Sequence, residues 1–253
     1  MNVGSAIILT SAANAAKMGV PRENWVFLHG HTDLREHALL ARADLGTSPA
    51  AAIATSGALE MAGIGVDDLA TVDLYSCFPI PVFNVCDALG FDVDAPMGLT
   101  VTGGLPFFGG PGHNYSSHAI VETVERLRRQ PDAFGLVVAN GGIMSKTSVG
   151  VYSTMPANWT PRSDRALQAG LDDTAPLPVA EFFTGSATLD TYTVDHGKRG
   201  PVGVVVATTH DDHTRVAALT SDDALLALLE TGDPFGVELT IEATEGANSA
   251  RLA

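Results

Sequence analysis

His113 is the residue whose place in the sequence most clearly allows chemistry. It ends the glycine-rich stretch TGGLPFFGGPGH, directly before a charged segment with helical spacing. A histidine just outside the positive end of a helix is favoured as the neutral imidazole, which can accept a proton or donate one to a developing oxyanion. The glycines let the backbone approach a ligand closely. Such turns are often structural only, so the spacing by itself leaves both roles of His113 open.

Two further turns place polar side chains where predicted strands end. The letters YSC at 75–77 lie where a strand passes into a helix, and ANGG at 139–142 forms a tight turn after a buried strand. Side chains at the carboxyl ends of strands meet at a crevice in α/β sheets. We therefore predict a single candidate site that includes His113. The residues predicted to line it are Tyr75, Cys77, Asn114, Asn140 and Gly141.

The two cysteines are expected to have different roles, so we predict no disulfide. Cys86 falls at helical spacing with Val82, Val85 and Leu89, which places it on the buried face. Cys77 stands at a helix start, where a thiolate can be activated. A small buried side chain would fit the same position, and both interpretations of Cys77 remain open.

Groups of histidines raise the question of a metal site, and we predict none. An HxH pair on a strand supplies two ligands, whereas zinc sites need three or four at fixed geometry. The stretch before His113 also lacks the dinucleotide-binding and P-loop patterns. The histidines considered as metal ligands are His29, His31, His37, His210 and His213.

Alternating strand and helix patterns predict the elements that position these residues. Helices are expected from Ser11 to Gly19, from Ser48 to Gly63, and at 79–90. Buried strands are expected at 6–9, 25–31, 71–77 and 136–138, with a hairpin turn at 140–141. This alternation predicts an α/β domain of mainly parallel strands with an antiparallel pair at its end.

The helix after His113 is specified in more detail than the others. Asn114 or Ser116 is its expected N-cap. Its expected buried stripe consists of Ile120, Val121, Val124 and Leu127. Glu122 lies four residues before Arg126, and Glu125 lies four residues before Arg129, which predicts two ion pairs along the helix.

The composition changes near residue 156 and indicates a second domain. Residues 1–155 form the predicted α/β domain, and 156–183 are rich in proline and aspartate and predict a connector. Residues 184–253 carry short β patterns and a helix capped by Ser221. Their strand spacing predicts a small β-barrel-like domain.

Charge and hydropathy exclude several functional classes. The 253 residues carry 29 acidic and 14 basic side chains, a formal net charge of -15, which argues against binding to nucleic acid or to anionic lipid. No apolar run approaches the roughly 18 residues of a membrane span, and the start of the chain lacks a signal-peptide pattern. We expect a cytoplasmic protein.

The motifs VDLYSCFP, TGGLPFFGGPGHNYSSHAI and VVANGGIMSKTSVGVYS follow one another in an order that resembles the C-terminal half of a thiolase. The resemblance is to actinobacterial thiolase-like acetyl-CoA acetyltransferases related to sterol-carrier-protein thiolase, and the tail resembles their additional C-terminal domain. It implies a thiolase-like layered mixed sheet with helices, followed by a small barrel. Residues 1–20 would be the end of the preceding half.

The same resemblance implies roles for individual residues. His113 matches the histidine of the family's Gly-His motif, which activates a nucleophilic cysteine supplied by the N-terminal half and helps to bind the thioester oxygen. Asn114 stands where many thiolases have proline, and Tyr75 stands where an asparagine or histidine orders an oxyanion water. Cys77 occupies a place held by alanine or cysteine. Ala139 stands where thiolases place a second, proton-transferring cysteine.

The resemblance therefore implies the C-terminal portion of an acyl-CoA acyltransferase of lipid metabolism. Its substrate would be a coenzyme A thioester, with no bound cofactor, and it would be inactive without an N-terminal half or partner subunit. The complete protein would be an oligomer. The alternative is a non-catalytic acyl-CoA-binding or interaction module on the same scaffold.

A chain that lacks half of such a fold should expose apolar helix faces and should not behave as a monomer. The helix faces predicted to be exposed carry Ala58, Leu59 and Met61 on one helix and Ile120, Val124 and Leu127 on the other.

Overall fold

The chain divides into two compact units, and the division is not a single cut. The computed structural model describes residues 3–110, 112–160 and 162–253. The first unit comprises Met1–Glu36 and Gly46–Thr174, and the second comprises His37–Leu45 and Ala175–Ala253. The short segment 37–45 thus interrupts the first unit and belongs to the second.

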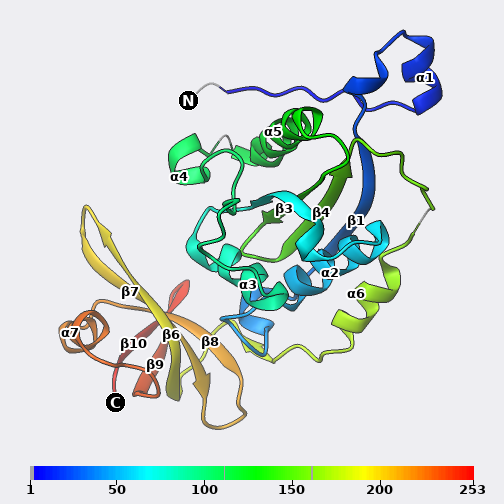
Figure 1. The fold of residues 1–253 in the computed structure, drawn as a ribbon. Helices are drawn as coiled ribbons and strands as arrows, with labels where there is room; N and C mark the ends of the chain where they lie inside the picture. Colours follow the sequence, from blue (N-terminus) through cyan, green and yellow to red (C-terminus); the bar gives the residue numbers. More distant parts are fainter. Residues whose placement is uncertain (1–2, 111, 161) are drawn as a thin grey trace. The chain divides into compact units, whose positions relative to one another are not determined.

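A four-stranded mixed sheet forms the centre of the first unit (Figure 1). Its strands, in spatial order, are β1 (Phe27–Arg35), β4 (Lys146–Ser153), β3 (Phe134–Gly141) and β2 (Leu69–Leu74). Only β2 and β3 are parallel, whereas β4 is antiparallel to both of its neighbours. The expectation of mainly parallel strands is therefore wrong, because β4 returns by a hairpin and inserts between β3 and β1.

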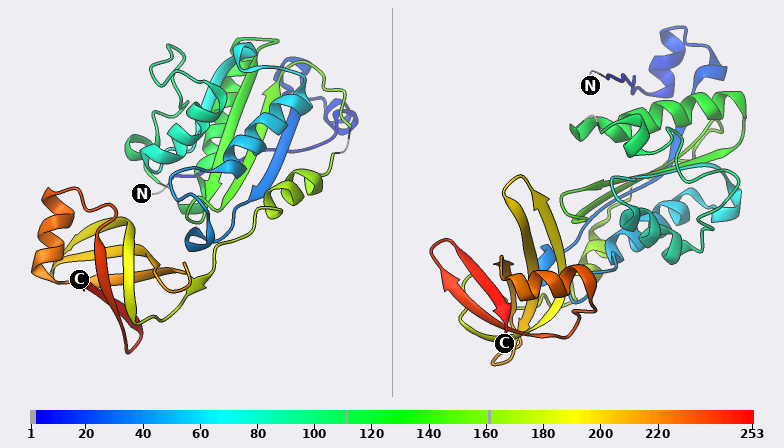
Figure 2. Two further views of the ribbon diagram at one scale, coloured as in Figure 1. Left: turned by 90° about the horizontal axis from the view of Figure 1, so that it is seen from below. Right: turned by 90° about the vertical axis from the view of Figure 1, so that its left-hand side faces the viewer.

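Helices cover both faces of this sheet, as the right-hand view of Figure 2 shows. The helices α2 (Pro49–Ala62) and α3 (Pro79–Leu89) lie on one face, and α5 (Tyr115–Arg129) lies on the other. The predicted signals at the ends of α2 are confirmed. The Ser48 hydroxyl accepts a hydrogen bond from the Ala51 N–H, and Gly63 adopts a left-handed conformation with φ 71° at the C-terminus.

The buried face of α5 differs from the predicted one. Ala119, Thr123 and Leu127 are buried, whereas Ile120 and Val124 are only half-buried. Leu127 alone is shared with the expected stripe, because the helix turns a smaller and more polar row toward the sheet. One expected ion pair is present, with Arg126 3.0 Å from Glu122; Arg129 lies 3.9 Å from Glu122, and Glu125 pairs with Arg128.

The beginning of the chain departs most from the sequence-based expectation. Residues 6–9 form no strand, and Ile8 and Leu9 are 84% and 93% exposed. The helix α1 (Ala12–Lys17) follows as predicted, with the Ser11 hydroxyl accepting from the Asn14 N–H. An apolar tetrapeptide with no neighbouring strand to pair with does not form a strand.

The remaining elements of the first unit are short. The β3–β4 hairpin turns later than predicted, because Asn140 and Gly141 still pair with Thr147 and Lys146, so the turn lies at 142–145. The other elements are α4 (Leu105–Phe108), α6 (Arg165–Asp172), η1 (Arg22–Asn24), η3 (Val66–Asp68) and η4 (Gly112–Asn114).

The segment that carries α6 covers the free edge of β1. The Asp33 N–H donates to the Asp164 carboxylate at 2.9 Å, and the Gln168 side chain bonds both the N–H and the C=O of Arg35. Part of the expected connector 156–183 thus supplies the hydrogen bonds that a further strand would make.

The second unit is a closed five-stranded barrel. The strands β10 (Ala247–Leu252), β9 (Glu238–Thr244), β6 (Gly185–Gly197), β7 (Gly200–Thr209) and β8 (Arg215–Thr220) follow one another, and β10 pairs with β8 to close the ring. The short strand β5 (Val179–Ala180) pairs with β8. The predicted barrel-like domain is confirmed.

The helix α7 (Asp223–Thr231) packs Leu225 and Leu229 into the core of the barrel. Its N-cap is Asp222, whose side chain accepts from the Leu225 N–H, and not Ser221 as predicted. Asp222 is one residue nearer to the first turn of the helix.

A buried arginine holds segment 37–45, which contains η2 (Leu39–Ala41), in this unit. The Arg215 guanidinium donates to the carbonyl oxygens of Leu40 and Arg42 and lies 3.3 Å from the Asp190 carboxylate. The Leu177 N–H donates to the Ala41 oxygen at 2.9 Å. A buried guanidinium with several acceptors is satisfied, so this early segment is a fixed part of the second unit.

Candidate active site

His113 lies in the turn η4, two residues before Tyr115, the first residue of α5. Gly112 has φ 63°, and His113 itself has a non-helical conformation with φ -88° and ψ 17°. The imidazole is exposed, and within the described ranges it takes part in no hydrogen bond or ion pair. Its place at the positive end of a fifteen-residue helix agrees with the predicted position, and its ring is available to a ligand.

Asn114 occupies the N-cap position of α5 but does not cap the helix with its side chain. Its amide oxygen instead accepts from the Ser117 hydroxyl, which also donates to the Asn114 backbone oxygen at 2.9 Å. The Ser5 hydroxyl donates to Ser117 at 2.8 Å. The start of α5 is therefore connected to the extended N-terminal segment.

Tyr75 and Cys77 lie directly after β2, and Tyr75 contacts the first turn of α5. The Tyr75 ring packs edge-on against Tyr115, with centroids 5.5 Å apart, and Cys77 packs against the same buried cluster. Burial, with a smaller contribution from Cys77, raises the pKa of the Tyr75 phenol, which is therefore neutral near pH 7. The structure thus brings Tyr75 against Tyr115, the residue after Asn114, and Cys77 against the cluster to which Tyr115 belongs.

Asn140 and Ala139 line a small cavity with Tyr75 at the end of β3. The cavity has a volume of about 10 Å³, and Asn84 of α3 and Thr147 of β4 also line it. The Asn140 amide oxygen and the Asn84 amide nitrogen are both buried without a hydrogen-bond partner among the described residues. A cavity of this size holds about one water molecule, which could bond both groups.

Gly141 is the predicted site residue with the least support. It ends β3, where it pairs with Lys146, and it does not line this cavity.

Asp73 is a site residue that the sequence reasoning missed. This carboxylate is 1% exposed, and its Oδ2 accepts from the Val101 N–H at 2.9 Å and from the Tyr115 hydroxyl at 3.1 Å. Burial raises its pKa to about 6, against the lowering effects of these two hydrogen bonds and of Arg126. Asp73 therefore connects β2 to the glycine-rich loop and to the first residue of α5.

Asn84 was also missed, and its only signal in the sequence is weak. It is 8% exposed and stands beside Val85 and Cys86 on the buried side of α3. A lone polar residue on an otherwise apolar helix face is the pattern that could have identified it.

Cys86 is a core residue, as predicted. It is 2% exposed within the main apolar cluster of the first unit, and burial, followed by the nearby Asp87 charge, raises the pKa of its thiol. A buried thiol of this kind is a poor nucleophile. Both cysteines are free, which agrees with the expectation of no disulfide.

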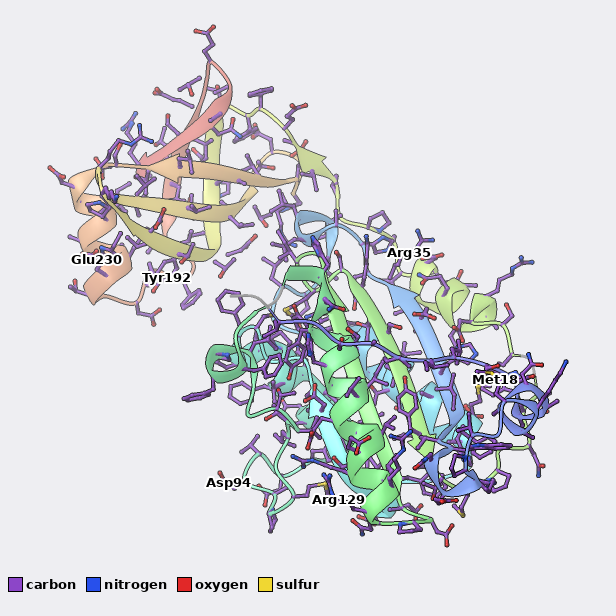
Figure 3. The ribbon with its side chains drawn as sticks, turned by 90° about the horizontal axis from the view of Figure 1, so that it is seen from above. Met18, Arg35, Asp94, Arg129, Tyr192 and Glu230 are labelled. Atoms are coloured by element: carbon purple, nitrogen blue, oxygen red, sulfur yellow. The ribbon has the colours of Figure 1, made fainter. Side chains whose placement is uncertain are left out.

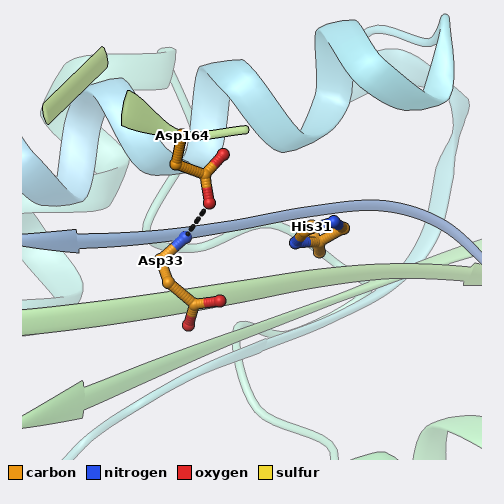
Figure 4. Close-up of side chains that lie close together, drawn as sticks. All are labelled: His31, Asp33 and Asp164. Carbon is orange, nitrogen blue, oxygen red and sulfur yellow. Dashed lines mark hydrogen bonds between the residues drawn. The ribbon is translucent and has the colours of Figure 1, made fainter. Parts of the chain in front are cut away.

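Among the described residues, the histidines considered as metal ligands do not form a shared cluster. His29 bonds the Met155 oxygen at 2.9 Å, and His31 stacks on Trp159. His31 does lie near two carboxylates, Asp33 and Asp164, with the three ligand atoms within 4.8 Å of one another (Figure 4). One Asp164 oxygen is already engaged by the Asp33 N–H, and Asp33 is exposed.

The exposed apolar side chains are not the predicted ones. Ala58 and Leu59 are 0% and 5% exposed, because α2 packs closely on β1, where Gly30 leaves no room for a Cβ beside the Ala58 carbonyl. Exposure is found instead in the N-terminal segment, around α3 and at the tip of α4. The large exposed side chains there are Ile7, Ile8, Leu9, Phe78, Ile80, Phe83 and Phe107.

Comparisons with known proteins agree with this architecture. Residues 166–246 match the family described as the thiolase-like protein type 1 additional C-terminal domain. A crystal structure of a monomeric SCP2-thiolase like protein type 1 from Mycobacterium smegmatis is similar to the chain, with 49% sequence identity and a TM-score of 0.91. The match covers 95% of this chain and 53% of that one, so the chain spans about half the length of this relative. No curated protein matches the chain.

None of the described helices is both long enough and apolar enough to cross a membrane.

Proposed function

The chain has a thiolase-like fold and carries the additional C-terminal domain of type 1 thiolase-like proteins in residues 166–246, and on this premise we propose that it supplies the histidine-bearing part of an acyl-CoA acyltransferase. The substrate is a coenzyme A thioester of lipid metabolism, handled in the cytoplasm with no bound cofactor. A nucleophile-bearing N-terminal half, in the same polypeptide or in a partner subunit, completes the site.

The exposed imidazole of His113 is the observation that carries this proposal. It lies at the N-terminus of α5 without a partner in the described part of the chain, two residues before Tyr115, which contacts Tyr75 and belongs to the cluster against which Cys77 packs. A free imidazole at this position can activate a thiol by accepting its proton and can then donate to the thioester oxygen. These are the two roles that the Gly-His resemblance implies for His113.

The nucleophile must come from outside the described elements. Cys86 is buried in the core, and Cys77 is half-buried against an apolar cluster. The exposed segment 7–9 and the exposed side chains of α3 and α4 leave apolar surface that further protein would cover. Both observations support a site that this chain alone does not complete, and we propose that the chain alone is inactive.

Reconstitution tests this proposal. The chain is combined with the part of the Mycobacterium smegmatis relative that lies outside the matched region, and thiolysis of acetoacetyl-CoA is followed with each component alone and with the mixture. We expect turnover in the mixture only, and its loss in His113→Ala. Turnover by this chain alone would overturn the requirement for a second half. Full activity of the variant mixture would overturn the role of His113.

A second function is favoured by two residues at the candidate site. Ala139 has no functional group to transfer a proton, and Tyr75 presents a neutral phenol where the resemblance expects a water-ordering amide or imidazole. The scaffold would then bind an acyl-CoA or a partner without chemistry. Calorimetric binding of acetyl-CoA by the reconstituted mixture, with no thiolysis, would support this alternative.

The expected oligomer is not supported by the relative, which is described as monomeric. We propose that the exposed apolar surface is covered within one assembled thiolase-like unit, so that the complete protein needs no second copy to bury it.

A further inference from the structure

The long strand β6 has an unpaired edge along its second half. It pairs with β9 only over Gly185–Thr188, and the last contact on that side is between Leu189 and residues 236–237. From Asp190 to Gly197, within the described residues of the second unit, β6 is paired with β7 alone. Alternate residues of such a strand present backbone N–H and C=O groups that a further strand can pair with.

A groove lies beside this edge, and we call it the β6 groove. Leu229 and Glu230 of α7 line it together with four residues of β6, which are Tyr192, Thr193, Val194 and His196. Phe235 completes the groove; it is 62% exposed, and its ring lies 5.7 Å from that of Tyr192. Figure 3 shows Tyr192 and Glu230 near each other in this unit. An aromatic pair beside a carboxylate attracts a cation through the ring faces and through the charge.

The charge of the second unit also favours a cationic ligand. Residues 175–253 contain twelve acidic and four basic side chains. Among the described residues, the one ion-pair partner of Glu230 is His196, at 3.4 Å. Two of the four basic residues, Lys198 and Arg199, lie at the turn between β6 and β7, two and three residues beyond His196.

We propose that the β6 edge and groove bind an extended peptide segment of a partner protein through strand addition, with an arginine or lysine of that segment seated between Tyr192, Phe235 and Glu230. The backbone of the segment pairs with β6 between Asp190 and Gly197, which supplies affinity independent of sequence. The basic side chain supplies specificity. Lys198 and Arg199 disfavour a second positive charge toward the turn, so the basic residue belongs on the Tyr192 and Phe235 side of Glu230.

The surface fits a peptide better than a small cation because the edge offers a row of backbone groups. A small cation would use the rings and the carboxylate but would leave the β6 backbone unpaired. Strand addition predicts that amide groups of β6 between 190 and 197 become protected when the ligand binds, in addition to changes at the groove side chains.

Two matched peptides test this proposal with the full chain. Each is a capped seven-residue peptide of alternating threonine and valine, with arginine at the centre of one and glutamate at the centre of the other. Binding is followed by amide chemical shifts and by hydrogen exchange. We expect the arginine peptide to shift and protect residues of β6 between 190 and 197, and the glutamate peptide to bind at least fivefold more weakly, as roughly one kcal/mol of charge and ring contact implies.

Substitutions in the groove separate the two parts of the proposed contact. Glu230→Gln and Phe235→Ala should each weaken binding of the arginine peptide by roughly fivefold, because an exposed ion pair or cation–ring contact is worth up to about 1 kcal/mol. The matched control is Glu242→Gln, an exposed carboxylate of β9 that lies 3.8 Å from Arg251 and should leave binding unchanged.

Three results would overturn the proposal. One is equal binding of the two peptides, which would remove the basic side chain from recognition. Another is binding of the arginine peptide with no added protection in β6, which would indicate a cation site without strand addition. The third is the absence of any shift at millimolar peptide. Because the substituted side chains are exposed, the variants should remain folded, and their circular dichroism spectra check this.

Discussion

Replacing Asp73 by asparagine should change how the stability of the first unit depends on pH. The carboxyl is 1% exposed, and burial raises its pKa from 3.8 to about 6. Between these two values the folded chain holds a proton that the unfolded chain has released. The protonated carboxyl thus favours folding fully below pH 3.8, and this contribution is lost as the pH rises through about 6.

The size of the effect follows from the pKa difference. A shift from 3.8 to about 6 corresponds to about 3 kcal/mol, since each pKa unit is about 1.4 kcal/mol. About 2.5 kcal/mol of this should be lost between about pH 4 and about pH 7.5. Asparagine has no such titration, and its amide oxygen can still accept from the Val101 N–H and the Tyr115 hydroxyl.

Urea unfolding at a series of pH values measures the difference. Trp25 and Trp159 are the two tryptophans of the chain, and both lie in the first unit, so their fluorescence reports its unfolding. We expect the free energy of unfolding of Asp73→Asn, relative to the unsubstituted chain, to rise by about 2.5 kcal/mol from about pH 4 to about pH 7.5. The matched control is Asp87→Asn, which removes an exposed carboxyl of the same unit.

A difference that stays flat across this range would refute the reasoning, because it would mean that the Asp73 carboxylate ionises without a desolvation cost. A difference that falls with pH would show that its hydrogen bonds outweigh burial. An equal rise in Asp87→Asn would assign the effect to net charge and not to burial.

Three further substitutions test separate parts of the structure. Gly135→Ala places a Cβ 2.6 Å from the methyl carbon of Thr123, and should lower the free energy of unfolding by about 1–3 kcal/mol in urea titrations monitored by tryptophan fluorescence. Arg215→Met leaves the Asp190 carboxylate without its buried partner, and circular dichroism should show the second unit destabilised by about 3–5 kcal/mol; a loss near zero would contradict the anchoring role. His113→Ala removes an exposed ring and should change the free energy of unfolding in urea titrations by less than about 0.5 kcal/mol. Any loss of turnover in this variant would then reflect catalysis and not stability.

Local features of the fold were predictable because their causes are local. Ser48 with Pro49 and Gly63 fix the ends of α2 through contacts within a few residues of each other. The turn that carries His113 follows from glycines and the helical spacing beside it. The order of the strands has no such local cause, because β1 and β4 pair Phe27 with Ser153.

The candidate site was predictable only in part for the same reason. The letters of the sequence place Tyr75 and His113 at junctions, but they do not show that Tyr115, two residues after His113, contacts both Tyr75 and Asp73. Asp73 lies within the apolar run of a strand. One acidic residue in such a run does not identify the groups that will hydrogen-bond it in the fold. The prediction of a strand at 6–9 was wrong because an apolar run becomes a buried strand only when a neighbouring strand is present to pair with it.

The membership of segment 37–45 in the barrel has a consequence for how the protein is made. Arg215 is 173 residues further along the chain than Arg42, whose carbonyl oxygen it binds. At about 5–20 residues per second, a ribosome takes roughly 9–35 s to synthesise the residues between them. During that time the segment lacks Arg215, its native partner, while the strands before and after it in the sequence are already made. We therefore expect misfolding of this chain to occur mainly by premature pairing of 37–45 with the first unit. Closure of the barrel late in synthesis removes the segment from that competition.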